Sequence, residues 1–215
     1  MPAYTGVGSR STPTDQMQRL RDLADILARE GYELRSGGAD GADTACEEGC
    51  ELACGAKSIW LPWPGFQNRW PNPAQRTFLP APGAFEIAAR IHPRWPMLTR
   101  GPRALHARNA HQVLGHGLED PSAFALCWTA DGAQTEADVN SKTGGTGTAI
   151  RLAAQRGVPV FNLAREGAED ALFAFLAKLR AQRLAGANAG APAHEEGDDG
   201  EEAEPPRNIL RFPTR

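Results

Sequence analysis

Residues 141–148, with the sequence SKTGGTGT, have the composition of a phosphate-binding turn. They follow an apolar run at 123–128 that is typical of a strand, and they precede a run at 149–154 that is typical of a helix. Between a strand and a helix, free backbone N–H groups can bind an anion, glycines allow its close approach, and threonine hydroxyls add donors. The pattern predicts a site for a phosphate-bearing ligand, and it is equally compatible with a ligand that is cleaved, carried or held. Its candidate ligands are Thr143, Gly144, Gly145, Thr146, Gly147 and Thr148.

Two other glycine-containing turns follow the first two strands that the sequence predicts, at 3–7 and 32–35. Because the carboxyl ends of parallel strands meet at one edge of a sheet, all three turns are expected to line one pocket where the strand order reverses. That convergence is a stronger indication of a ligand than any single glycine cluster. The two turns add Gly8, Ser9, Arg10, Ser36, Gly37 and Gly38 to the candidate phosphate ligands.

The rest of the chain extends this alternation of strands and helices. Further strands are expected at 58–61, 123–128 and 157–161, and helices at 13–30, 84–91, 102–114 and 168–184. The order predicts an α/β fold, with a Rossmann-like parallel sheet of about five strands and helices on both faces. The expected domain is 1–184 with a Pro-, aromatic- and Arg-rich insertion at 63–98, then an acidic disordered linker at 185–206 and a short basic segment at 207–215.

The charges of the chain are unevenly distributed. Residues 186–206 hold seven acidic residues and no Lys or Arg, so the rest of the chain has 23 basic against 19 acidic residues. Residues 63–117 hold seven arginines and one acid, Glu86. The distribution favours an anionic ligand such as nucleic acid, although a solubilising tail and a solvated arginine face would give the same counts. Without a long apolar run or the features of a signal peptide, a cytoplasmic protein with no membrane partner is expected.

Aromatic residues alternate with arginines in the insertion at 63–98. Such a pattern can stack bases and contact phosphates, or it can form a small core that leaves the arginines outside. Because the arginines have almost no acidic neighbours in the sequence, Arg69 and Arg76 are expected to contact nucleic acid.

Three cysteines, Cys46, Cys50 and Cys54, are spaced four apart and share one stripe of a helix. Metal ligands must converge on one point, whereas this row extends along the helix axis, so packing against the sheet is favoured over metal or redox chemistry. Neither a metal nor a cofactor is expected.

Taken together, these motifs resemble a known superfamily. Residues 7–10 (VGSR) and 36–43 (SGGADGAD) resemble turns of the DNA-processing proteins DprA/Smf. Residues 144–148 (GGTGT) resemble the glycine loop of the LONELY GUY (LOG) nucleotide phosphoribohydrolases, and 105–109 (LHARN) resemble their Met-His-x-Arg-Lys motif. Both groups belong to the SLOG superfamily of Rossmann-like domains, and the resemblance covers about 3–180 outside the insertion.

The two branches of this superfamily imply different functions. DprA-like proteins bind single-stranded DNA and help to load a recombinase, whereas LOG-like enzymes cleave the N-glycosidic bond of a nucleoside monophosphate. By position, Arg108 matches the catalytic arginine of the enzymes, and Arg151 stands where they have a glutamate. A positive charge there opposes the cation that develops during such a cleavage. His106 could orient a phosphate or a base, or it could be an ordinary hydrogen-bonded helix residue.

The sequence therefore favours a DprA-like nucleotide or single-stranded nucleic-acid binding protein of DNA metabolism, with Arg108 and Arg151 adding charge to the phosphate ligands. An enzyme of the phosphoribohydrolase or deoxyribosyltransferase type, with Arg108 as its catalytic residue, and a sensor of a signalling nucleotide are the alternatives. The enzyme would need a carboxylate from another loop, and the same acids could instead cap turns and helices: Asp40, Asp43, Asp131, Glu136 and Asp138. The resemblance also implies a homodimer and a recombinase partner.

Overall fold

The computed structural model describes the backbone of residues 1–189 and the side chains of residues 1–185. Residues 1–175 form one compact unit, and a second unit begins at Leu176. Everything below concerns the first unit. Of the linker expected at 185–206, residues 185–189 are instead the end of the last helix, which continues past 184 to Ala189. Residues 190–206 and the segment expected at 207–215 lie outside the described residues.

Six parallel strands form a single sheet in the order β4-β3-β2-β1-β5-β6. They are β1 (Ala3–Gly8), β2 (Glu33–Ser36), β3 (Lys57–Trp60), β4 (Thr77–Phe78), β5 (Phe124–Trp128) and β6 (Val160–Asn162). The strand order reverses at β1, which pairs with β2 on one side and with β5 on the other. This arrangement confirms the expected Rossmann-like α/β fold.

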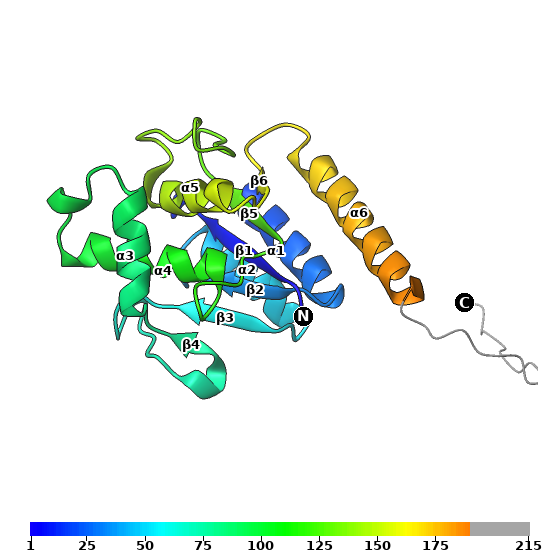
Figure 1. Cartoon of the computed structure of the whole chain (residues 1–215), viewed down its shortest axis with the longest axis horizontal. Helices are drawn as coiled ribbons and strands as arrows, with labels where there is room; N and C mark the ends of the chain where they lie inside the picture. Colours follow the sequence, from blue (N-terminus) through cyan, green and yellow to red (C-terminus); the bar gives the residue numbers. More distant parts are fainter. Residues whose placement is uncertain (190–215) are drawn as a thin grey trace, which may run out of the picture. The chain divides into compact units, whose positions relative to one another are not determined.

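Helices cover both faces of the sheet (Figure 1). They are α1 (Thr14–Arg29), α2 (Ala42–Leu52), α3 (Pro82–Ile91), α4 (Arg100–Leu114) and α5 (Gly147–Gln155). A further helix, α6 (Ala168–Ala189), begins in the first unit and continues into the second. Helices α1 and α2 pack together on one face, α4 and α5 pack on the other, and α3 packs against α4 and α5. Among residues 1–189, no helix combines the length and the hydropathy needed to cross a bilayer.

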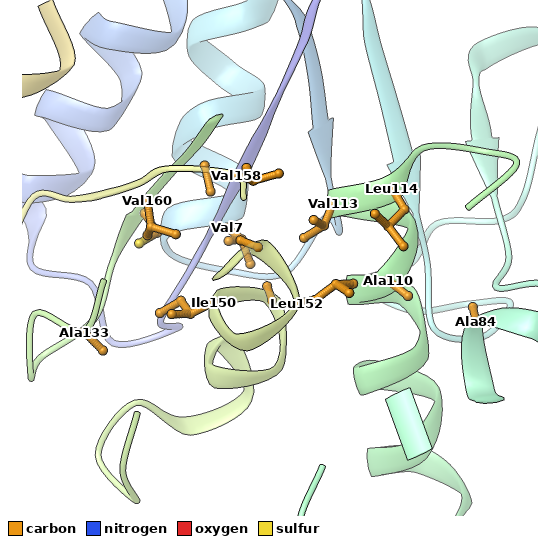
Figure 2. Packing of buried hydrophobic residues seen from close by; sticks show 14 of the residues in the cluster. Val7, Ala84, Ala110, Val113, Leu114, Ala133, Ile150, Leu152, Val158 and Val160 are labelled. Carbon is orange, nitrogen blue, oxygen red and sulfur yellow. The ribbon is translucent and has the colours of Figure 1, made fainter. Parts of the chain in front are cut away.

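The alternation of side chains along β1 divides the core between the two faces. Thr5 hydrogen bonds to the carbonyl of Gln112 in α4 at 2.7 Å, and Val7 lies in the apolar cluster that α4 and α5 share with the sheet. Figure 2 shows Val7 among side chains of these helices, Val113 and Ile150 included. Gly6 points to the opposite face, where a Cβ would come within 3.0 Å of Cys46 in α2. The two-residue period of the strand thus supports both helical layers.

The sixth strand lies within the insertion and was not expected from the sequence. Ile59 N donates to Arg76 O at 2.9 Å and Leu61 N donates to Phe78 O at 2.8 Å, which adds β4 to the edge of the sheet beside β3. β4 has only two residues and lies in a Pro-rich segment, so its sequence cannot show the alternation of apolar and polar residues that predicts a strand. Only its pairing with β3 in the folded protein identifies it.

His111, to which the sequence assigns no role, holds the insertion against the rest of the domain. Its Nε2 accepts from Ala81 N at 3.0 Å, and its Nδ1 lies 2.9 Å from Gly115 O and therefore carries the proton. The ring stacks on Trp60 of β3 with centroids 5.5 Å apart, and burial lowers its pKa. A neutral histidine thus ties the insertion to α4 and β3.

Candidate phosphate-binding site

A cavity of about 190 Å³ lies at the carboxyl ends of β1 and β5, where the strand order reverses. Ligands of open α/β sheets bind at such a point because the turns after neighbouring strands diverge there. Residues from β1, from all three glycine-containing turns and from α4 contribute to its wall. They are Val7, Gly8, Arg10, Ala39, Pro102, Leu105, His106, Arg108, Asn109, Gly145 and Thr146.

The glycine turn at Gly144–Thr146 is a single 3-10 turn that leads directly into α5. Gly144 has a φ of 63°, which favours glycine, and a Cβ on Gly144 or Gly145 would meet no atom within 4 Å. On its other side the turn is held in place, because Asn109 Nδ2 donates to Gly145 O at 2.9 Å. A fixed turn with open space in front of its glycines is the geometry in which backbone N–H groups bind an anion.

Asp131, one of the acids that could replace the missing glutamate, supports the glycine turn instead. Its carboxylate accepts from the Thr143 hydroxyl and, at 2.7 Å, from the Thr129 hydroxyl. Partial desolvation raises the pKa of Asp131, but these hydrogen bonds outweigh it and hold the pKa below its ordinary value. Thr143 is therefore 3% exposed and serves as an anchor of the turn rather than as part of its open edge.

The other acids of this long loop also have partners of their own. Asp138 accepts from the backbone N–H groups of Gln134 and Thr135 at 3.0 and 2.9 Å, and Glu136 lies 3.4 Å from Gln155 Nε2. Hydrogen bonds from those two N–H groups lower the pKa of Asp138. Neither side chain lines the cavity, nor does Asp40, which accepts from Gln67 on the protein surface.

Arg108 is buried beside the last of these acids, Asp43. Its Nη1 donates to Gly37 O, its Nη2 lies 3.5 Å from Asp43 Oδ2, and its Nε has no partner among the described residues. Burial lowers the pKa of Arg108 and raises that of Asp43, and each shift is opposed by the charge of the partner. Gly8 N also donates to Asp43, at 3.2 Å. The guanidinium is thus held rigidly at the wall of the cavity.

Phe66 of the insertion lies against both arginines of the cavity. Its ring centroid is 5.5 Å from Cζ of Arg108 and 5.9 Å from Cζ of Arg10, distances typical of cation–π contacts. Arg10 is exposed, and within residues 1–189 it makes no ion pair. The Arg10 guanidinium is therefore available to bind an anion, whereas that of Arg108 is already held by Asp43 and Gly37.

The remaining turn residues have mainly structural contacts. A Cβ on Gly8 would lie 2.5 Å from Ala42 Cβ, and the Ser36 hydroxyl donates to Gly6 O at 2.8 Å. Ser9 Oγ accepts from Ser11 N at 3.0 Å. A Cβ on Gly37 would overlap the Arg108 guanidinium, and one on Gly38 would lie 2.8 Å from Arg69 Nη1. The glycines of the second turn thus make room for arginines.

Arg69 and Arg76 have acidic partners that lie far away in the sequence. Arg69 forms a bidentate ion pair with Glu47 at 2.7 and 2.9 Å, and Arg76 Nη2 lies 2.6 Å from Glu33 Oε1. Their expected contact with nucleic acid stays a prediction, but both charges are already partly compensated.

Thr148 and Arg151 lie on the other side of the glycine turn and line a second cavity of about 360 Å³. His106 borders both cavities, and its Nδ1 lies 2.8 Å from Thr148 Oγ1. Thr146, Gly147 and Thr148 are all buried, and a Cβ on Gly147 would lie 2.7 Å from Val139.

Sequence reasoning missed two residues that shape the site, Phe66 and Asn109. Asn109 stands where the resembling motif has a lysine, and its position one turn along α4 from Leu105 places it in the same cavity wall. For Phe66 no local pattern distinguishes a platform for arginines from an ordinary core residue.

Cys46 and Cys50 of α2 are buried as the sequence predicts, and so is Cys127. The prediction is wrong for Cys54, which lies beyond the end of α2 with a φ of 51° and is exposed. Among residues 1–189, no group of three or more His, Cys, Asp or Glu side chains is close enough together to hold a metal ion.

No family model matches this chain, and no curated protein does. Among solved structures, DNA processing protein A from Helicobacter pylori, described with a unique single-stranded DNA binding mode, is similar at a TM-score of 0.46 and 19% identity. The match covers 75% of this chain and 64% of that chain. A likeness of this degree carries no conclusion about the site.

Proposed function

We propose that this protein binds the phosphate groups of single-stranded nucleic acid at the Gly144–Thr146 turn, as a divergent member of the SLOG superfamily. One observation carries the proposal. The cavities on the two sides of the turn are lined by four arginines, Arg10, Arg108, Arg94 and Arg151, and by no carboxylate among the described residues. An anion is the ligand that such a wall stabilises.

The positions of the carboxylates favour binding of a ligand over its cleavage. N-glycosidic cleavage needs a carboxylate near the reacting sugar. Asp131 holds the turn, Asp138 holds its own loop, and Asp43 pairs with Arg108. Glu136 contacts Gln155 of α5 and Asp40 accepts from Gln67, so each candidate acid already has another partner. The cleavage alternative would require one of these contacts to break.

A strand is favoured over a free mononucleotide by the aromatic residues beside the first cavity. Trp63 packs edge-on against Phe66 with centroids 5.3 Å apart, and 39% of its surface is exposed. An exposed aromatic ring next to a phosphate site can stack a neighbouring base.

Fluorescence anisotropy with a labelled oligothymidylate tests the proposal. We expect Arg10→Ala to weaken binding about tenfold at low salt, because a hydrogen-bonded charge contact to phosphate is lost. The slope of log affinity against log salt should fall by about 0.7, the value for one phosphate of a single strand. Arg156→Ala is the matched control, since Arg156 is an exposed arginine just beyond the far end of α5.

Failure of the wild-type protein to bind any oligonucleotide at low salt would contradict the proposal. Release of free base from nucleoside monophosphates, abolished by Arg108→Ala, would support the enzyme instead. The homodimer, the recombinase partner and the cytoplasmic location stay predictions from the sequence, and light scattering of the purified protein would test the first.

A further inference from the structure

The second cavity is separated from the first by the glycine turn and by His106. Two consecutive residues of the turn face different cavities, because Gly145 lines the first and Gly144 lines the second. The wall of the second cavity comes from the end of α3, the long loop after β5 and the start of α5. It consists of His92, Pro93, Arg94, His106, Val139, Asn140, Ser141, Gly144, Thr148 and Arg151.

Two arginines of this wall have no counter-ion. Within residues 1–189 neither Arg94 nor Arg151 makes an ion pair, and the cavity is lined by no Asp or Glu. Their charges act on the neighbouring His92, whose pKa is lowered first by desolvation and then by Arg151 and Arg94. Uncompensated cations gathered around one space favour an anion there.

Two histidines, His92 and His106, line the same cavity. His106 Nδ1 lies 2.8 Å from Thr148 Oγ1, and with the hydroxyl assigned as the donor, the proton of the neutral ring is on Nε2. His92 Nδ1 accepts from Arg94 N at 3.3 Å, so its proton is also on Nε2. The rings lie 4.4 Å apart. Two imidazole rings thus join two guanidinium groups in the wall of the cavity.

We propose that this second cavity binds a second phosphate of the same ligand, so that the protein takes two successive phosphates of a strand, one on each side of the glycine turn. The inference rests on the proposed function and deepens it. Because His106 and the turn stand between the cavities, the two phosphates are separated by a nucleoside rather than joined as a diphosphate.

Titration calorimetry with small ligands tests this assignment. The probes are thymidine 5′-monophosphate, thymidine 3′,5′-bisphosphate and ADP with AMP as its reference. We expect the wild-type protein to bind the bisphosphate about tenfold more tightly than the monophosphate, as one added charge-assisted contact allows. In Arg151→Gln and in Arg94→Gln this ratio should fall toward one. In the control Arg156→Gln, at an exposed position just beyond the other end of α5, it should stay at the wild-type value.

An equal affinity of the wild-type protein for both thymidine ligands, or an unchanged ratio in Arg151→Gln, would overturn the second site. Tenfold tighter binding of ADP than of AMP, with no tighter binding of the bisphosphate than of the monophosphate, would overturn the assignment of two phosphates separated by a nucleoside. In each of these results the monophosphate still binds, so the proposed function stands. If no nucleotide binds, the proposed function and this inference both fail.

Discussion

At the residue scale, burial and the neighbouring arginines determine the protonation state of the histidines in the site. Desolvation lowers the pKa of His106 to about 4, with further contributions from His92 and Arg108. His106 is therefore neutral at pH 7 and acts through its hydrogen bonds. An anion in either cavity would oppose this shift, because negative charge favours the protonated imidazole.

The lowered pKa of His106 makes stability depend on pH. Between its ordinary pKa near 6.5 and its folded value of about 4, the unfolded chain binds more protons at this residue than the folded protein does. Stability is thus lost as the pH falls through this window. We expect His106→Asn to reduce the loss of unfolding free energy between pH 8 and pH 5, measured by urea denaturation.

At pH 8 the same variant should be less stable by about 1 kcal/mol, since the smaller amide loses packing of the buried ring, although its oxygen can replace Nδ1 as the partner of Thr148. His92 and His111, whose pKa values are also lowered, preserve part of the pH dependence. An identical decline in His106→Asn and the wild-type protein would contradict the assignment of the shift to His106.

The residue types of the site follow from the sequence, but their pairing does not. Glycine, serine and threonine runs identify the turns because these residues have distinct backbone and hydrogen-bonding properties. Arg69 and Arg76 lack acidic neighbours in sequence, yet Glu47 and Glu33 meet them across the fold. Ion pairs between distant segments depend on strand order and register, which residue spacing leaves undetermined.

At the scale of elements, the glycine turn is positioned by α4 on one side and by the long loop after β5 on the other. Asn109 of α4 binds its backbone, and Asp131 binds Thr143 at its start. The turn is therefore ordered without a ligand, which lowers the entropy cost of binding one.

A methyl group on the open side of this turn should reduce ligand binding without reducing the stability of the fold. A Cβ on Gly145 meets no atom within 4 Å, and Gly145 does not have a positive φ. We expect Gly145→Ala to change stability by no more than about 0.5 kcal/mol. Because the methyl group fills space in front of the turn, oligonucleotide affinity should fall about tenfold. This is the effect expected when one charge-assisted hydrogen bond to phosphate is lost.

Gly117→Ala is the control for that variant, since a Cβ there also meets no atom within 4 Å and Gly117 lines neither cavity. Thermal unfolding and anisotropy on the same samples give both quantities. Equal affinity of Gly145→Ala and the wild-type protein would remove the turn from the binding site.

Element prediction from the sequence succeeds where a pattern is long. Helix α4, expected at 102–114, spans Arg100–Leu114, and Gly31, with a φ of 79°, follows the end of α1 as predicted. It fails for β4, where two paired residues carry no period. It also places the start of α1 one residue too early, because Pro13 occupies the cap position and the helix begins at Thr14.

At the scale of the whole molecule, the sheet topology brings together residues from distant parts of the chain. Arg10 follows β1, Arg108 lies in α4 and Gly145 follows β5, yet all three line one cavity because β1 is central and pairs with both β2 and β5. The alternation of strands and helices predicts this convergence at the sheet edge. The sequence does not reveal the packing of the insertion, whose Phe66 lies against two arginines of the cavity, Arg10 and Arg108.

The accessibility of the four free cysteines tests this packing as a whole. Cys46 and Cys50 of α2 and Cys127 of β5 are buried, whereas Cys54, just beyond the end of α2, is exposed. Burial raises the pKa of Cys46, that of Cys50 to about 11 and that of Cys127 to about 12, so these thiols are both shielded and protonated.

Ellman's reagent should therefore modify one thiol quickly in the native protein and all four after denaturation. In Cys54→Ser the fast reaction should disappear, because the remaining thiols become accessible only when a helix separates from the sheet. A second fast thiol at Cys46 or Cys50 in the native protein would show that α2 packs less tightly on β1 than the structure has it. Since α2 carries Asp43, the partner of Arg108, such a result would also remove the rigid support of the cavity wall.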